Sequence, residues 1–316
     1  MKEVWLIGTG NIAIEYAKVL ESLGIDYIAI GRGKPNINKF IADTQHDAIE
    51  GGIEKFLKLN PEIPTHALVT VNIETLSSTA RILLKYGVKN ILLEKPGICN
   101  PNEIYELAQL TRLMDANVLI AYNRRFYAST LKAQEIIKED GGVRSFGFEF
   151  TEWAHRILPI FDGGDRFKYW FLANSSHVVD LAFYLGGKPT QLNCFTSGGN
   201  EWHPSSTIFT GAGVSDSGAL FNYHANWEAP GRWFVEICTK NHRLYFKPIE
   251  TLQIQNIGSI ELSHVKLEDE KDKQFKPGLY MQIKCFLENS FFNFCTIDEQ
   301  KEYIEKIYNK MSGYKI

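Results

Sequence analysis

Two short segments carry side chains whose types and spacing are suited to moving a proton. The first is Glu94-Lys95-Pro96, which directly follows an apolar run. A lysine there can hydrogen-bond a substrate hydroxyl, and its charge favours a developing alkoxide. The second holds His177 and Asp180, whose spacing places both on one helical face. In a helix's first turn the dipole disfavours the imidazolium, so a neutral histidine can accept a hydroxyl proton.

Each of these residues also has an ordinary structural interpretation. Lys95 can be a solvent-exposed lysine in a surface loop, and His177 can be a hydrogen-bonded structural histidine. Asn174 or Ser175 can simply cap the helix that follows. Which interpretation applies depends on where the surrounding strands and helices place these residues.

A glycine-rich turn near the N-terminus is the strongest positioning feature. Val4–Ile7 is apolar at every position, which predicts a fully buried strand. Gly8 and Gly10 then allow a tight turn, and Ala13 lets a following helix over residues 12–23 pack closely. Strand, turn and helix in this order aim a helix N-terminus at an anion such as a dinucleotide pyrophosphate. The alternative is a βα turn without a ligand.

Apolar strands then alternate with helices through the first third of the chain. Strands are predicted at 27–30, 67–71, 91–93 and 118–121, and helices at 75–86 and 102–114. This alternation predicts a doubly wound parallel sheet, in which ligands bind at the carboxyl ends of the strands. The residues just beyond those ends are therefore candidate site residues, namely Gly8, Gly10, Asn11, Ile12, Arg32, Asn72, Glu94, Lys95 and Arg124.

The pattern changes after about Tyr122, where short strands rich in aromatic and β-branched residues take over. Strands are predicted at 143–153, 190–196, 206–210, 219–225, 233–239 and 244–247. Helices are predicted at 131–138, 176–185, 281–292 and 298–311, and the charged run 268–276 as a solvated loop. We therefore expect an α/β protein with a Rossmann domain over 1–121. An α+β domain with a large, mainly antiparallel sheet follows over 122–316.

Composition excludes several functional classes. With 34 Lys and Arg against 37 Asp and Glu, the net charge of −3 gives no reason to expect nucleic acid or an anionic membrane as partner. The first predicted strand begins at Val4, so no secretory signal peptide is expected. Five scattered cysteines and no metal-ligand spacing among the histidines favour free thiols, a reducing cytoplasm and no metal site.

Taken together, the motifs resemble the glucose-fructose oxidoreductase / inositol dehydrogenase family of dinucleotide-dependent oxidoreductases. The matches are Gly8-Thr9-Gly10-Asn11-Ile12-Ala13, Glu94-Lys95-Pro96, Tyr122-Asn123-Arg124-Arg125-Phe126, His177 with Asp180, and Gly278-Leu279-Tyr280 with Gln282 and Phe286. The resemblance implies that Lys95 and His177 flank the hydroxyl-bearing carbon of a sugar or cyclitol. It also implies pairing of subunits through the open face of the antiparallel sheet, as a homodimer or homotetramer.

Two departures from the family pattern affect the expected ligands. Ala173 stands where the family commonly has an aspartate, so the substrate contacts differ from those of inositol dehydrogenases. Candidate substrate contacts are Arg124, Trp170, Asn174 and Asp180. No acidic residue ends the second strand, and Arg32 follows it instead. An arginine there can accept a 2′-phosphate, which favours NADP over NAD.

The sequence thus predicts hydride transfer between nicotinamide and a hydroxyl-bearing carbon of a sugar, sugar derivative or nucleotide sugar. Two alternatives share the fold. One is a glycosidase that transiently oxidises its substrate, and the other is a regulator that binds the dinucleotide without catalysis.

Overall fold

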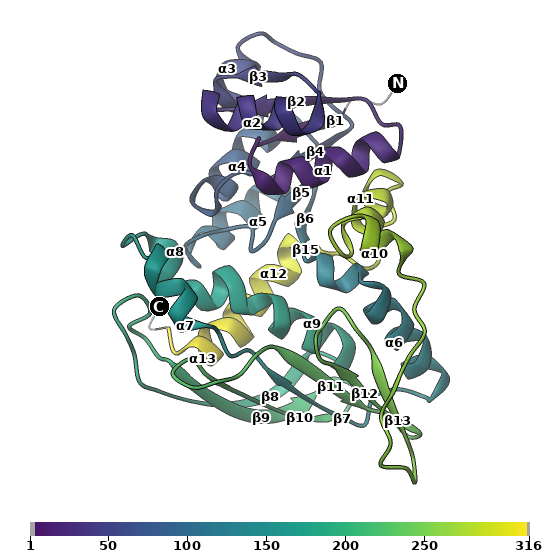
Figure 1. Ribbon diagram of the computed structural model, residues 1–316. Helices are drawn as coiled ribbons and strands as arrows, with labels where there is room; N and C mark the ends of the chain where they lie inside the picture. Colours follow the sequence, from purple (N-terminus) through teal and green to yellow (C-terminus); the bar gives the residue numbers. More distant parts are fainter. Residues whose placement is uncertain (1–3, 315–316) are drawn as a thin grey trace. The chain divides into compact units, whose positions relative to one another are not determined.

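The computed structural model describes residues 4–314, and these fall into two compact units (Figure 1). Unit 1 contains the described chain up to Asn123 together with Lys271–Lys301. Unit 2 contains Arg124–Glu270 and the described chain from Glu302 onward. The units are therefore not two continuous stretches of sequence. The predicted boundary between two folding domains, 1–121 and 122–316, stays a prediction.

Unit 1 is built on a seven-stranded sheet with the order β15-β6-β5-β4-β1-β2-β3. Its strands are β1 (Val4–Ile7), β2 (Tyr27–Gly31), β3 (Ala48–Glu50), β4 (His66–Val69), β5 (Asn90–Glu94), β6 (Asn117–Ala121) and β15 (Cys295–Thr296). All pairs are parallel except β15 with β6. The order from β3 to β6 is that of a Rossmann sheet, and its switch point lies between β1 and β4.

Helices connect these strands because each has an apolar face that the sheet can bury. In unit 1 they are α1 (Asn11–Ser22), α2 (Lys34–Thr44), α3 (Gly52–Leu57), α4 (Leu76–Tyr86), α5 (Glu103–Leu113) and α11 (Leu279–Leu287). In α1 the buried positions include Tyr16, Val19 and Leu20, as the helical period of the sequence predicts. The sequence did not predict α2, α3 or the short strands β3 and β15.

Unit 2 contains an eight-stranded sheet with the order β14-β13-β12-β11-β7-β10-β9-β8. Its strands are β7 (Ser145–Glu149), β8 (Pro189–Ser197), β9 (Ile208–Ser215), β10 (Leu220–Asn226), β11 (Phe234–Cys238), β12 (His242–Phe246), β13 (Gln253–Asn256) and β14 (Ser263–His264). Only the β7–β10 pair is parallel among these described strands. The predicted α/β class with a parallel and a mainly antiparallel sheet is confirmed.

Some predicted bounds were wrong. The strand expected over 143–153 ends at Glu149, because the chain turns there toward α7 (Ala154–Ile157). The charged run 268–276 contains a short helix, α10 (Glu270–Gln274). The last predicted helix is divided into α12 (Ile297–Tyr303), a π-helical turn over Ile304–Tyr308 and α13 (Asn309–Ser312).

The core of unit 2 lies between one face of this sheet and α9 (Ser176–Gly186), which packs on β7 and β11 (Figure 1). The remaining helices of this unit are α6 (Ala128–Glu139) and α8 (Asp165–Lys168). Phe146 stacks on Phe221 within this core, and Phe148 packs edge-on against Phe183 of α9. The large aromatic side chains of the sheet strands and their turns are all buried within this unit, namely Phe221, Tyr223, Trp227, Trp233 and Phe246. They therefore offer no exposed aromatic surface for the expected pairing of subunits.

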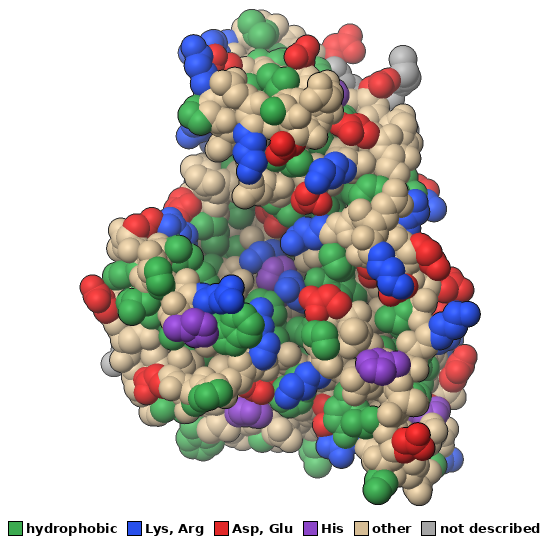
Figure 2. All heavy atoms as spheres, viewed as in Figure 1, with side chains coloured by type: hydrophobic (Ala, Val, Ile, Leu, Met, Phe, Trp, Pro, Cys, Tyr) green, Lys and Arg blue, Asp and Glu red, His purple; other side chains and the backbone are tan. Residues whose placement is uncertain are grey.

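The opposite face of this sheet is mixed in character. Leu220 is 63% exposed, and Asn222, Glu236 and Arg243 lie in the same shallow hollow. Over the side of the molecule seen in Figure 2, Lys and Arg side chains are interspersed with Asp and Glu side chains. No helix within residues 4–314 is long and apolar enough to cross a bilayer.

Candidate functional site

The glycine-rich turn of unit 1 connects β1 to α1, and its two glycines lie in different environments. Gly8 has φ of +119°, and a Cβ there would lie 2.5 Å from Thr70 Oγ1 and 2.8 Å from the Thr70 backbone. Gly10 has φ of −80°, and a Cβ there would have nothing within 4 Å. The backbone thus requires glycine at position 8. At position 10 a glycine leaves open space that a ligand can fill.

That open space adjoins the first turn of α1. No side chain among residues 4–314 caps this helix, so its first N–H groups are left for another acceptor. A pyrophosphate can approach this turn closely, because the N–H groups are uncapped and no protein atom requires Gly10 to be a glycine. The residues present therefore fit a dinucleotide.

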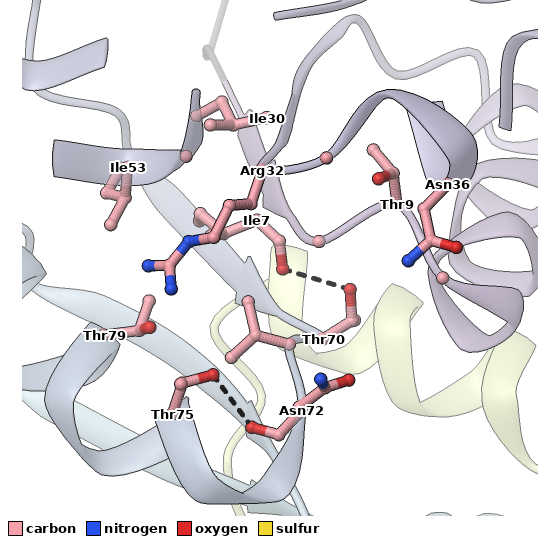
Figure 3. Close-up of a pocket in the computed structure, with 15 residues that line it drawn as sticks. Ile7, Thr9, Ile30, Arg32, Asn36, Ile53, Thr70, Asn72, Thr75 and Thr79 are labelled. Atoms are coloured by element: carbon pink, nitrogen blue, oxygen red, sulfur yellow. Dashed lines mark hydrogen bonds between the residues drawn. The ribbon is translucent and has the colours of Figure 1, made fainter. Parts of the chain in front are cut away.

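A pocket at the carboxyl ends of β1, β2 and β4 extends this turn (Figure 3). Four predicted site residues line it: Gly8, Gly10, Arg32 and Asn72. Thr9 of the predicted glycine-rich turn lines it too. Other lining residues drawn in Figure 3 were not predicted, and they include Asn36, Ile53, Thr70, Thr75 and Thr79. The strand-end rule would have found Thr70, since it directly follows β4.

Two further predicted cofactor residues, Asn11 and Ile12, begin α1 and do not line this pocket. The Asn11 side-chain oxygen accepts a hydrogen bond of 2.7 Å from Lys39 Nζ on α2. This bond ties the first turn of α1 to α2 across the edge of the pocket.

Arg32 forms an ion pair with a carboxylate that is distant in the sequence. Its Nη2 donates to Oε1 and Oε2 of Glu54, on α3, at 3.1 and 3.2 Å. Both side chains remain exposed, at 65% and 52%. Although no acid ends β2, a carboxylate from the short helix after β3 thus reaches this place. Neither β3 nor α3 was predicted, so Glu54 was missed.

Glu94 and Lys95 lie at the carboxyl end of β5, and both are half-buried. The Tyr16 hydroxyl on α1 donates to Glu94 Oε1 at 2.7 Å. Burial raises the pKa of the Glu94 carboxyl, while the bond from Tyr16 and the charge of Lys95 act in the opposite direction. Tyr16 therefore fixes the residue that precedes Lys95.

His177 lies in α9 of unit 2 and is 7% exposed. The residues before it are also helical, because Phe171–Ser175 forms a π-helical turn that runs into α9. Ser175 has φ of −64° and ψ of −25°, and its side chain makes no cap. Asn174 and Ser175 are therefore not N-caps, and His177 lacks the free helix N-terminus on which the expected dipole effect depends.

The side chains of Asn174 and Ser175 bind Glu152 instead. Asn174 Nδ2 donates to both carboxylate oxygens at 3.1 and 3.0 Å, and Ser175 Oγ donates to Oε1 at 2.7 Å. Glu152 is only 3% exposed. This buried carboxylate holds the π-helical turn that precedes His177, and it was not predicted from the sequence. The position of Glu152 just beyond β7 could have identified it as a candidate site residue.

Arg124 begins unit 2 and points its guanidinium toward aromatic rings. Its Cζ lies 5.0 Å from the Trp233 ring and 5.8 Å from the Tyr127 ring, and its Nε is buried without a hydrogen-bond partner. Burial lowers the pKa of this guanidinium, partly opposed by nearby Glu250.

Asp180 and Trp170 occupy different environments within unit 2. Asp180 is fully buried and binds Arg125 through both carboxylate oxygens. Trp170 is half-buried, stacks on Phe167 at 5.5 Å and meets the Trp202 ring at 6.0 Å. Around His177, unit 2 therefore brings together Arg124, Trp233 and the segment bound to Glu152. Within residues 4–314, no group of three His, Cys, Asp or Glu side chains is arranged to hold a metal ion.

Comparison with known proteins gives a likeness in fold. No protein-family model and no curated protein matches this chain. UDP-N-acetylglucosamine 3-dehydrogenase GnnA from Acidithiobacillus ferrooxidans is 15% identical, with a TM-score of 0.75 over 99% of this chain and 97% of that one. Levoglucosan dehydrogenase in complex with NADH and L-sorbose is 14% identical, with a TM-score of 0.76 over 98% and 95%. The dehydrogenase MviM from Clostridium difficile is 19% identical, with a TM-score of 0.75 over 98% and 99%. At these identities the likeness shows a shared fold along nearly the whole chain.

Proposed function

We propose that this protein is an NAD(P)-dependent oxidoreductase acting on a hydroxyl-bearing carbon of a sugar, sugar derivative or nucleotide sugar. The observation that carries the proposal is the Gly8–Gly10 turn, which opens a pocket at the carboxyl edge of a Rossmann sheet. The shared fold supports it, since GnnA and levoglucosan dehydrogenase are named as sugar dehydrogenases. A bound nicotinamide would supply the hydride chemistry at this site.

Lys95 and His177 are the proposed catalytic residues. In the oxidative direction the His177 imidazole accepts the hydroxyl proton. The Lys95 ammonium group hydrogen-bonds the same oxygen and stabilises its developing negative charge. Tyr16 and Glu94 position the Lys95 backbone, and Glu152 positions the turn before His177.

The cofactor is proposed to be NADP, with NAD as the alternative. Arg32 lies in the pocket beside the first turn of α2, where Asn36 also lines the wall. A guanidinium and an uncapped helix N-terminus both favour a 2′-phosphate. The Glu54 carboxylate competes with that phosphate for Arg32, so the preference depends on how readily this exposed pair opens.

Within unit 2, Arg124, Trp170 and Asn174 remain proposed substrate contacts. Asp180 accepts two bonds from Arg125 and has no exposed surface. We therefore propose that it positions α9 and the Arg124 segment and does not touch the substrate.

Substitution of the catalytic pair tests the proposal. In Lys95→Met and His177→Ala, kcat should fall by about a hundredfold or more, while cofactor binding measured by nicotinamide fluorescence changes much less. Near-normal turnover in either variant would remove that residue from the mechanism. Release of a sugar without net change in nicotinamide absorbance would instead identify the glycosidase. Cofactor binding with no turnover of any sugar would identify the regulator.

We also propose that subunits associate as a homodimer or homotetramer through the half-exposed face of the unit 2 sheet. Leu220 and Phe234 line its hollow together with the charged side chains of Glu236 and Arg243. Light scattering at micromolar concentration checks this assembly, and a monomer would contradict it.

A further inference from the structure

Trp233 in unit 2 has two guanidinium groups and an imidazole around it. The Cζ atoms of Arg124 and Arg232 lie 5.0 and 4.4 Å from its ring centroid. The His177 ring centroid lies 6.3 Å from that of Trp233. Trp233 is itself only 7% exposed, so its ring is a fixed surface for these groups. Two positive charges thus lie close to the proposed catalytic histidine.

Arg232 is held by stacking on a second indole. Its Cζ lies 4.5 Å from the Trp153 ring, and Trp153 Nε1 donates to the Gly231 carbonyl at 2.9 Å. Contacts with two aromatic rings restrain the plane of the guanidinium and leave its N–H edge for hydrogen bonds. Arg232 remains exposed, so a ligand can reach that edge.

Neither arginine forms an ion pair with a carboxylate of the described residues. The buried Nε of Arg124 also has no hydrogen-bond partner there. Glu250 and Glu152 act on Arg124 from a distance, but Glu250 is exposed and Glu152 accepts bonds from Asn174 and Ser175. Arg232 and Arg124 repel each other, and burial further disfavours the Arg124 charge. An anion bound between them would offset both unfavourable effects.

We propose that Arg124 and Arg232 bind an anionic group of the substrate, so the substrate is an acidic sugar derivative carrying a carboxylate or a phosphate. This inference rests on the proposed oxidoreductase function and specifies its substrate class. A planar guanidinium forms two parallel hydrogen bonds with either anion, which explains the use of arginine and its stacking on Trp153. The reacting hydroxyl then lies on the part of the sugar nearest His177.

The test compares glucose, glucuronate, glucose 6-phosphate and UDP-glucose as ligands and substrates of the full chain, with saturating cofactor. The charged compounds should raise the melting temperature and be oxidised with a higher kcat/KM than glucose. A response to glucuronate alone identifies a carboxylate, and a response to the other two charged compounds identifies a phosphate. Equal or better binding and oxidation of glucose would overturn the inference while leaving the oxidoreductase in place. Oxidation of no sugar, without a selective melting shift, would contradict both.

Variants of Arg232 test the role of this residue. Charge-assisted hydrogen bonds contribute about 1.5–3 kcal/mol, so Arg232→Gln should raise KM for the charged substrate about 10- to 100-fold. Its kcat should change much less. Arg232→Lys keeps the charge without the planar fork and should be intermediate. The matched control is Arg112→Gln, which removes the same charge from an exposed arginine paired with Asp298 in unit 1 and should leave KM unchanged. A KM for the charged substrate that is unchanged in Arg232→Gln would refute the inference.

Discussion

Arg125 and Asp180 form a buried, two-point ion pair in unit 2. Arg125 Nε donates to Asp180 Oδ2 at 2.9 Å, and Nη2 donates to Oδ1 at 2.6 Å. The two side chains are 2% and 0% exposed. The pair joins the segment that carries Arg124 to the helix that carries His177. It therefore fixes two proposed site segments to each other within one unit.

Breaking this pair should destabilise unit 2 strongly. Asp180→Asn removes the carboxylate charge that Arg125 binds, and breaking a buried ion pair typically costs about 3–5 kcal/mol of unfolding free energy. Chemical denaturation measures the change. The matched control Arg112→Gln removes an exposed arginine that binds Asp298 at 2.9 Å, and it should cost only about 0–1 kcal/mol. Equal effects of the two substitutions would contradict the structural role of the pair.

The two glycines of the first turn should respond differently to alanine. Gly8→Ala forces a Cβ against Thr70 at positive φ, so it should lower stability by at least about 1 kcal/mol. Gly10→Ala meets no protein atom and should lower stability less. The added Cβ would occupy the space proposed for the pyrophosphate and push it away from the backbone N–H groups, so Gly10→Ala should still weaken cofactor binding at least about tenfold. Cofactor titration and thermal unfolding distinguish the two effects, and unchanged cofactor affinity in Gly10→Ala would exclude this turn as the pyrophosphate site.

The Arg32–Glu54 pair should control the choice between NADP and NAD. Arg32→Ala should weaken NADP binding and leave NAD binding nearly unchanged. Glu54→Gln frees Arg32 from an exposed partner worth about 0–1 kcal/mol, so it should strengthen NADP binding by up to about fivefold. Titration of wild type and both variants with both cofactors measures these shifts. Equal weakening for both cofactors in Arg32→Ala would show that this residue does not read the 2′-phosphate.

Acid should destabilise unit 2 through His203. This residue is fully buried, its Nδ1 lies 2.6 Å from the Ser206 carbonyl oxygen, and burial lowers its pKa to about 4. In the unfolded chain its pKa is about 6.5, so between these values the unfolded state binds the extra proton. Stability is therefore complete above about pH 6.5 and decreases as the pH falls toward 4. At pH 5 the loss from this group is about 2 kcal/mol.

Denaturation of wild type and His203→Gln between pH 7 and pH 5 measures this contribution. The variant lacks the titrating imidazole, so its unfolding free energy should fall less across that range. An equal fall in both proteins would contradict the assigned pKa. The exposed His264 provides the control, since His264→Gln should retain the pH dependence of the wild type.

The sequence by itself determined the parts of this protein that depend on local order. Buried strands are apolar at every position, and the glycine turn follows the first of them directly, so strand, turn and helix were visible without coordinates. The same order placed Arg32, Asn72 and Lys95 at strand ends. The short strand β3 and helix α3 carry too few residues for a periodic pattern, and they were missed.

Only the tertiary structure showed which side chains these residues contact. Glu54 reaches Arg32 from 22 residues away, and Glu152 reaches Ser175 from 23. Arg232 reaches Trp153 because their segments lie beside each other at the end of β7 and the start of β11. The aromatic strands of unit 2 likewise predicted a sheet, but not which face is buried. Periodicity specifies an element and its apolar face, whereas the partner of a polar side chain depends on how distant elements pack.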